Sequence, residues 1–203
     1  MGQGEAVAAA ASQPPPGAPS ATLRWLNFAV FQAAWFAAVL GAAHRVPLWG
    51  TACVAAALSW HLAISARPAA ELRLVGAACL IGLVAESGVV ALGLVAYPSG
   101  QPVSWLAPYW VVALWGLLAM ALNVTLRWLK GRWWLAAALG AGAGPLSFAA
   151  GARLGGARLL EPVAALATLA LMWCALMPVL MWLSSRFDGV APLATNEGES
   201  DAR

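Results

Sequence analysis

Residues 72–97 read LRLVGAACLIGLVAESGVVALGLVAY, and this apolar run decides the fold because it is long enough to cross a lipid bilayer as a helix. Glu86 lies near its middle and is the only acid inside any run of this kind in the sequence. A charged side chain inside a membrane is costly and is by default a candidate for function. A structural role, in which Glu86 joins two helices through a hydrogen bond or an ion pair, is an equally good explanation of its position.

The composition of the whole chain indicates an integral membrane protein. Of its 203 residues, 62% are hydrophobic and 9% are charged, whereas soluble proteins have about 45–50% apolar and about 25% charged residues. Six apolar runs, each of about 20 residues or more, are predicted to span the membrane. They are residues 25–43, 48–66, 72–97, 105–129, 133–152 and 162–183.

These runs predict helices rather than the strands of a membrane barrel. Each run is about twice as long as a barrel strand and lacks alternation of polar and apolar residues, so only helices satisfy the backbone in lipid. We therefore predict an all-α polytopic membrane protein, a six-transmembrane-helix bundle with short loops and antiparallel sequential neighbours. Residues 23–186 form this membrane domain, and residues 1–22 and 187–203 are predicted to be disordered tails.

The distribution of Lys and Arg predicts the orientation of the bundle. Eight of these residues lie on the side of the N-terminus and three on the opposite side, which places both termini in the cytoplasm. The eight are Arg24, Arg67, Arg73, Arg127, Lys130, Arg132, Arg186 and Arg203, and the three are Arg45, Arg153 and Arg158. The abundance of Ala and the excess of Arg over Lys indicate a GC-rich genome, so we expect a bacterial inner membrane.

The sequence favours membrane lipid as a partner over nucleic acid, and it predicts no cofactor. The basic residues are spread over the ends of the runs and form no patch of the kind that binds nucleic acid. His44 and His61 have no neighbouring ligands at the spacing of a metal site, so no metal is predicted. The chain contains no nucleotide-binding loop and no recognisable nucleophile motif. The sequence therefore leaves open whether the protein is an enzyme.

Polar residues inside the runs fall into two layers when depth is counted at about 1.5 Å per residue. His61, Asn123 and Arg127 belong to a layer close to the cytoplasmic side. Glu86 lies deeper, about 20 Å from Arg73, so His61 is not expected to be its partner. Ser147 lies at a similar depth in the fifth run, and Arg153 lies about 9 Å beyond it. We predict that Glu86 pairs with Arg153 if the third and fifth helices touch. The candidate ligand-binding or proton-binding residues are Glu86, Ser147, Arg153, His61, Asn123 and Arg127.

Small and aromatic residues predict where helices approach closely. Gly82 lies on the helical face of Glu86, and Ala136, Gly140 and Gly144 recur every four residues, a spacing that permits close packing. Seven tryptophans fall at the ends of runs, where indole rings anchor a helix at the membrane interface. They are Trp25, Trp49, Trp105, Trp128, Trp133, Trp134 and Trp182. Trp35, Trp115 and Trp173 fall near mid-span, where they either fill the core or line a cavity for a flat apolar ligand.

Several short stretches between residues 25 and 186 form a recognisable set. They are Asn27-Phe28, residues 31–36 (FQAAWF), Glu86 with residues 91–94 (ALGL), residues 108–110 (PYW), Leu122-Asn123, residues 126–129 (LRWL), residues 144–148 (GPLSF) and residues 151–155 (GARLG). Together they resemble the DUF2878 family of bacterial inner-membrane proteins. The acid is usually Asp in that family, so Glu86 departs from its pattern by one methylene group. The resemblance implies a membrane location and places Glu86, Asn123, Arg127, Pro145, Ser147 and Arg153 in the family pattern. It implies no activity.

Three functions are compatible with these features. The first is the binding or transport of a lipid-like or small apolar molecule at a polar site around Glu86. The second is an integral-membrane enzyme of lipid or isoprenoid metabolism, with His61, Asn123 and Arg127 near the cytoplasmic face and Glu86 as acid or base. The third is a structural or assembly partner of another membrane complex. We favour them in this order.

Overall fold

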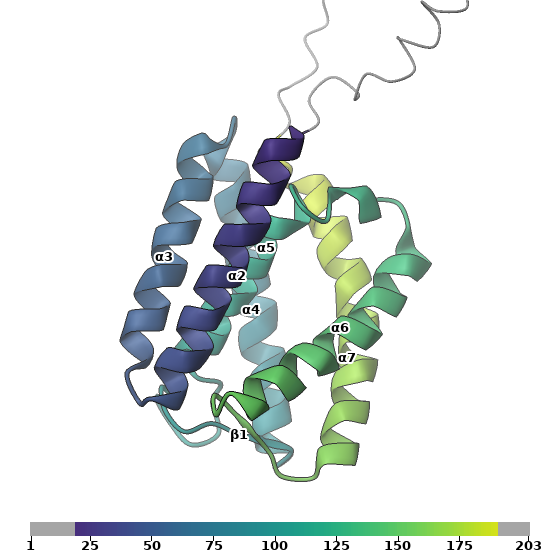
Figure 1. The fold of residues 1–203 in the computed structure, drawn as a ribbon. Coiled ribbons are helices and arrows are strands. Elements are labelled where there is room, and N and C mark those ends of the chain that lie inside the picture. The colour runs from purple at the N-terminus through teal and green to yellow at the C-terminus, as the bar shows by residue number, and fades with distance from the viewer. Residues whose placement is uncertain (1–18, 191–203) are drawn as a thin grey trace, which may run out of the picture.

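The computed structural model describes residues 19–190, which form six α-helices, one 3₁₀ turn and a two-stranded ribbon (Figure 1). The elements are α2 (Ala21–Ala43), α3 (Pro47–Ile64), α4 (Pro68–Ala91), β1 (Val95–Ala96), α5 (Tyr109–Leu122), η1 (Arg127–Leu129), α6 (Trp133–Arg153), β2 (Arg158–Leu159) and α7 (Pro162–Arg186). The prediction of an all-α architecture is confirmed.

Five of these helices are long and apolar enough to span a membrane: α2, α3, α4, α6 and α7. The sixth, α5, has 14 residues and is therefore about 21 Å long, shorter than the hydrocarbon core of a bilayer. The prediction of six spanning helices thus holds for five, and the fourth predicted span is wrong in its length. Its apolar run covers residues 105–129, but the helix covers only Tyr109–Leu122.

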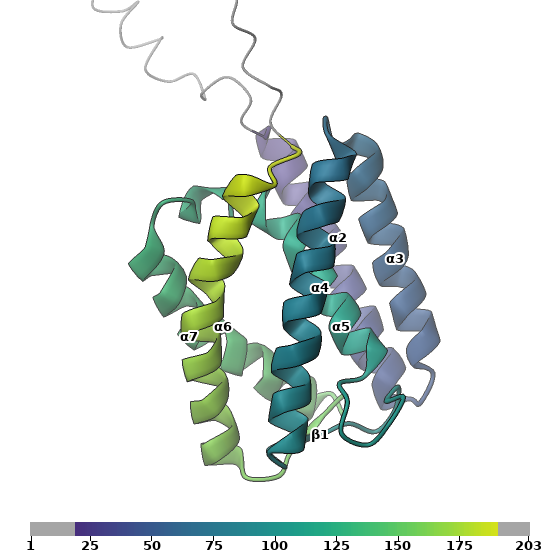
Figure 2. The same ribbon diagram turned by 180° about the vertical axis from the view of Figure 1, so that it is seen from behind.

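The short helix α5 lies at the centre of the bundle, where it packs against α2, α3, α4 and α7 (Figures 1 and 2). Nine of its residues are buried. Because protein surrounds it, irregular backbone at its ends is tolerated at membrane depth. Polar side chains from other helices also satisfy backbone groups there. The Asn27 amide donates to the carbonyl of Met120, and the Ser87 hydroxyl accepts from the N–H of Ala107.

The helices form two groups. Helices α2, α3, α4 and α5 pack around one another. Helices α6 and α7 form a hairpin, and they pack mainly against each other. The prediction of antiparallel sequential neighbours holds for α2–α3, α4–α5 and α6–α7, but α5 and α6 share no extensive packing. Residues 123–132, which include the 3₁₀ turn η1, carry the chain away from α5 before α6 begins (Figure 1).

One connection is longer than predicted. Helix α4 ends at Ala91 rather than at residue 97, because Gly93 adopts a φ of 68°, a left-handed conformation that a helix does not accommodate. Residues 92–108 then form a loop whose strand β1 pairs in antiparallel register with β2, the partners being Val95 with Leu159 and Ala96 with Arg158. This ribbon ties the end of α4 to the α6–α7 connection.

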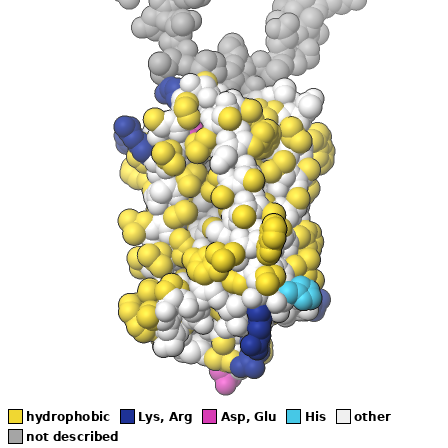
Figure 3. Space-filling view, turned by 90° about the vertical axis from the view of Figure 1, so that its left-hand side faces the viewer, with side chains coloured by type: hydrophobic (Ala, Val, Ile, Leu, Met, Phe, Trp, Pro, Cys, Tyr) yellow, Lys and Arg dark blue, Asp and Glu magenta, His cyan; other side chains and the backbone are white. Residues whose placement is uncertain are grey.

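The surface is that of a membrane protein. Hydrophobic side chains cover the middle of the bundle, and charged side chains gather at its two ends (Figure 3). The seven tryptophans predicted as interface anchors are all exposed, from 44% for Trp133 to 89% for Trp134. The start of α2 and the end of α7 lie at the same end of the bundle (Figure 1).

The tail boundaries differ slightly from the prediction. Ala21 and Thr22, assigned to the N-terminal tail, are the first residues of α2, whose N-cap is Ser20. Residues 187–190, assigned to the C-terminal tail, contact the bundle, and Gly189 is buried. The predicted disorder of residues 1–18 and 191–203 concerns parts of the chain outside the described residues.

Candidate functional site

Glu86 lies in the last third of α4 and is fully buried. The indole N–H of Trp115 donates to its Oε1 atom at 3.1 Å, and the hydroxyl of Tyr97 donates to Oε2 at 3.3 Å. Both donors are neutral groups. Within residues 19–190, the described ion pairs do not include Glu86, so its carboxylate is held by hydrogen bonds alone.

The Trp115 ring is part of a stack that runs through four helices. Trp115 of α5 and Trp173 of α7 stack with their ring centroids 4.6 Å apart and their planes 17° from parallel. Gly82 of α4 lies against the outer face of Trp115, and Gly144 of α6 lies against Trp173, so that a methyl group at either glycine would collide with the ring. We call this arrangement the Gly82–Trp115–Trp173–Gly144 stack. The predicted close approaches at Gly82 and Gly144 are confirmed, and so is that at Gly140, which packs on the backbone of Trp173.

A cavity of about 680 Å³ lies between α2 and α5 on one side and α6 on the other, in the space left because α5 and α6 do not pack together. We call it the Glu86 cavity, since Glu86, Tyr97 and Trp115 form part of its wall. Most of its lining is apolar or aromatic. Such a cavity, with few polar groups at one place, is the usual form of a site for a small apolar ligand.

The candidate residues of the fifth predicted span divide in two. Ser147 lines the Glu86 cavity, as its predicted depth suggested. Arg153 is exposed at the end of α6 and makes no described ion pair, so the predicted pair of Glu86 with Arg153 is not formed. That pair required contact between α4 and α6. These helices are not packed neighbours, because α5 and α7 lie between them.

A second buried acid, Glu71, contacts several polar residues at one end of the bundle. This is the end that holds the start of α2 and the end of α7 (Figure 1). His61 Nε2 lies 2.8 Å from Glu71 Oε2, while the Asn123 amide donates to Oε1 at 2.7 Å and the N–H of Gly189 donates to Oε1 at 2.6 Å. The side chains of His61, Glu71 and Asn123 are buried. The structure therefore brings together His61 and Asn123, both predicted site residues, through an acid that the sequence analysis did not select.

Charged residues extend this group, which we call the Glu71 cluster, towards the surface. Lys130 donates to Asn123 Oδ1 at 2.6 Å and to Asp188 Oδ2 at 2.8 Å, and Arg127, the third candidate residue of this layer, forms an ion pair of 2.6 Å with Asp188. Burial lowers the pKa of the Lys130 ammonium below its usual range, although the neighbouring Asp188 acts in the opposite direction. The cluster thus satisfies its own charges and joins α3, α4, the end of α5 and residues 187–190.

Glu71 was missed because the predicted span began one residue after it. A signal was nevertheless present in the sequence. Pro68 is typical of the first position of a helix, and its presence places the start of α4 before Glu71. Had the helix been started there, Glu71 and His61 would have faced each other across the short α3–α4 connection. The statement that Glu86 is the only acid inside a spanning helix is therefore corrected to two acids in α4.

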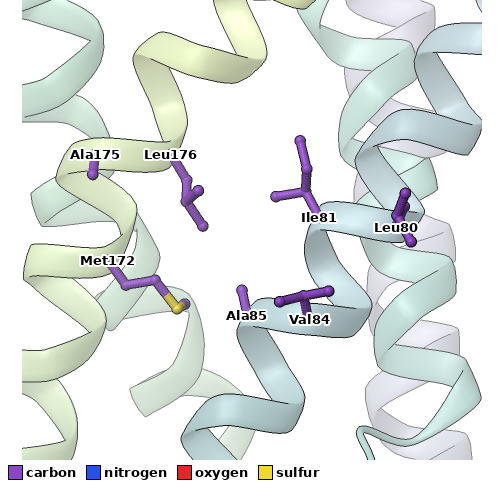
Figure 4. A pocket seen from close by; sticks show the side chains of 7 residues that line it. All are labelled: Leu80, Ile81, Val84, Ala85, Met172, Ala175 and Leu176. Carbon is purple, nitrogen blue, oxygen red and sulfur yellow. The ribbon is translucent and has the colours of Figure 1, made fainter.

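A groove of about 480 Å³ lies between α4 and α7 and is lined by seven apolar side chains (Figure 4). Ile81 and Ala85 of α4 face Met172 and Leu176 of α7 across it (Figure 4). None of these seven side chains is polar, so the groove offers no group that would orient a ligand. Together with the Glu86 cavity it leaves the α6–α7 hairpin joined to the other helices over a small contact area that includes the tryptophan stack.

The part of the chain that the structure describes contains no group of three or more His, Cys, Asp or Glu side chains placed to hold a metal ion. The described residues form a multi-pass α-helical membrane protein, as shown by five candidate spans, an apolar surface and exposed tryptophans near the span ends. Residues 24–179 match the family model described as "Protein of unknown function (DUF2878)", so the chain belongs to this family, as its resemblance predicted. A search of curated proteins and a search of solved structures find no match to the chain.

Proposed function

We propose that this protein binds, and carries within the membrane, a lipid-like or small apolar molecule that occupies the Glu86 cavity. Glu86, with Tyr97 and Trp115, forms the polar end of the site, and the apolar walls receive the rest of the molecule. Its location in a bacterial inner membrane is part of the proposal and rests on the abundance of Ala and the excess of Arg over Lys. The cytoplasmic position of both termini is also part of it and rests on the distribution of Lys and Arg.

The observation that carries this proposal is the cavity itself. Ligand pockets in proteins have volumes of about 300–1,000 Å³ and mainly apolar walls with a few polar groups. A partly open space of about 680 Å³ beside a buried carboxylate, lined mainly by apolar side chains, has this size and this lining. The lining of the cavity matches molecules that partition into the hydrocarbon region of a bilayer.

Catalysis that combines Glu86 with the cytoplasmic polar layer receives no support from the geometry. His61 and Asn123 surround Glu71, which precedes Glu86 by 15 residues, or about 22 Å along the same helix. Glu71 and Lys130 are satisfied by neighbouring groups, as expected of residues that hold helix ends together. We therefore assign the Glu71 cluster a structural role.

The proposal is tested by photolabelling in lipid nanodiscs with a long-chain alcohol that carries a diazirine group, followed by peptide mapping with mass spectrometry. We expect labelling of Leu114 and Leu118 of α5, which line the cavity. Ala143→Trp, which fills the cavity from α6, should abolish that labelling, whereas Ala138→Trp, at an exposed alanine of α6 outside the cavity lining, should leave it unchanged. Equal labelling of α5 in both variants would contradict the proposal.

A further inference from the structure

We propose that the molecule bound in the Glu86 cavity is a lipophilic organic cation, that is, an apolar molecule carrying a bulky, weakly hydrated positive group such as a quaternary ammonium. This inference rests on the function proposed above and specifies its ligand class. Three features of the cavity carry it: its charge, the chemistry of its walls and the position of its carboxylate.

When Glu86 is ionised, the charge of the cavity is negative and uncompensated. Among the described residues that line it there is no Lys, Arg or His, and Glu86 is the single carboxylic acid. The two groups bonded to the Glu86 carboxylate, Trp115 and Tyr97, are neutral donors. In a medium of low dielectric constant the field of such a carboxylate extends over several ångströms, because little water screens it. A positive group in the cavity provides the missing counter-charge.

The walls are suited to a cation that makes few hydrogen bonds. Trp35 and Tyr97 line the cavity with partly exposed rings. Trp110, Trp115 and Trp173 also line it, but Trp110 and Trp115 are 3% and 2% exposed, and Trp115 and Trp173 stack on each other. The face of an aromatic ring attracts a positive charge, most strongly when the ring is that of tryptophan and when the cation has lost its water. Recognition of quaternary ammonium groups by aromatic cages relies on this attraction.

The position of the carboxylate explains why the cation should be bulky and weakly hydrated. Glu86 has 0% exposure, and both of its carboxylate oxygens already accept hydrogen bonds, from Trp115 and Tyr97. A primary ammonium needs several acceptors at hydrogen-bond distance, and Glu86 is screened from it. A quaternary cation needs none and is stabilised by the rings and by the negative charge behind them.

Other ligand classes fit less well. An anionic headgroup would lie beside an acid, with no basic side chain among the described lining residues to offset its charge. A neutral polar headgroup would find few free partners, because the Tyr97 hydroxyl and the Trp115 N–H already donate to Glu86. The other hydrogen-bonding groups in the lining are the side chains of Gln32 and Ser147 and the indole N–H groups of Trp35 and Trp173. They are spread over three helices, α2, α6 and α7.

The test compares three probes of related shape in equilibrium dialysis with the full chain in a neutral maltoside detergent. They are the cation tetraphenylphosphonium, the anion tetraphenylborate and the neutral triphenylphosphine oxide. We expect saturable binding of the cation, with an affinity about 10-fold or more above that of the neutral probe, and no saturable binding of the anion. Glu86→Gln should reduce the affinity for the cation about 10-fold and leave that for the neutral probe unchanged, while Glu161→Gln, at an exposed acid outside the cavity, should change neither.

A second variant keeps Glu86 in place in case Glu86→Gln does not fold. Ser147→Lys introduces a positive charge into the cavity lining and should abolish binding of the cation, whereas the uncharged Ser147→Gln should retain it. Equal binding of the cation and the neutral probe, unaffected by Glu86→Gln or Ser147→Lys, would overturn the cation assignment and leave the proposed function standing. Absence of saturable binding by all three probes would overturn the cation assignment, and the photolabelling experiment decides separately whether the cavity holds any apolar molecule.

Discussion

Trp115 and Trp173 lie face to face, 4.6 Å apart, and each ring rests on a glycine of a further helix. This stack joins the α6–α7 hairpin to the other four helices at the depth where the Glu86 cavity and the apolar groove otherwise separate them. The same Trp115 ring donates its N–H to Glu86. One side chain therefore contributes both to the packing of the hairpin and to the polar end of the cavity.

The first prediction concerns the glycine beneath Trp115. Gly82→Ala should destabilise the protein by about 1–3 kcal/mol, because the added methyl group overlaps the Trp115 ring and has to displace it. Gly88→Ala is the matched control, since a methyl group there meets no atom within 4 Å. Thermal unfolding in detergent, followed by size-exclusion chromatography, measures the difference. Equal melting temperatures for the two variants would show that Trp115 does not rest on Gly82.

The second prediction separates the two stacked rings by their hydrogen bonds. Trp115→Phe removes the donor to Glu86 and leaves a buried carboxylate oxygen unsatisfied, which should cost about 1–3 kcal/mol. Trp173→Phe should cost less, because its Nε1 is buried without a partner among the described residues and no hydrogen bond is lost. Both changes shorten a ring of the same stack, so the loss of aromatic contact is similar in the two proteins. Chemical denaturation in mixed micelles compares them, and a larger loss for Trp173→Phe would contradict the geometry.

The third prediction concerns the acid of the second cluster. Glu71→Ala should destabilise the protein by about 3–5 kcal/mol, because His61, Asn123 and the N–H of Gly189 all lose a buried partner. Glu161→Ala, at an exposed acid just before α7, should change stability by no more than about 0.5 kcal/mol. Expression yield and melting temperature provide the readout. A Glu71 variant as stable as the Glu161 variant would show that the cluster does not hold the helix ends.

The fourth prediction uses two truncations of the C-terminus. A chain that ends at Val190 keeps every contact of the Glu71 cluster described above and should melt like the full chain. A chain that ends at Phe187 loses the ion pairs of Asp188 with Arg127 and Lys130 and the bond from Gly189 to Glu71. It should be less stable by about 3 kcal/mol or more, since a buried acid loses a donor and Lys130 its counter-charge. Indistinguishable melting curves for the two truncations would rule out this contribution of residues 188–190.

Local sequence patterns predicted much of the fold because they report properties that each helix has by itself. The five long helices follow from runs of apolar residues, and the seven exposed tryptophans follow from their places at the ends of those runs. The close approaches at Gly140 and Gly144 follow from a spacing of four on one helical face. These predictions needed no knowledge of which helix would be the neighbour.

The length of α5 could not be predicted in this way. Residues 105–129 are as apolar as a spanning helix, but hydropathy does not distinguish a segment that faces lipid from one that faces other helices. In this protein the surrounding helices provide the apolar environment, and polar groups such as Asn27 and Ser87 satisfy its ends. A short helix is stable there because it does not have to cross the bilayer by itself.

Residue patterns alone were enough to predict a helical membrane protein, its family and a buried acid, Glu86, at the depth of Ser147. The tertiary structure decided the partners: Trp115 and Tyr97 for Glu86 in place of Arg153, and Glu71 for His61 and Asn123. The physical reason is that depth along a helix follows from counting residues, whereas contact between helices depends on packing. The tryptophan stack, the separation of α5 from α6 and the Glu86 cavity arise only when all six helices are assembled.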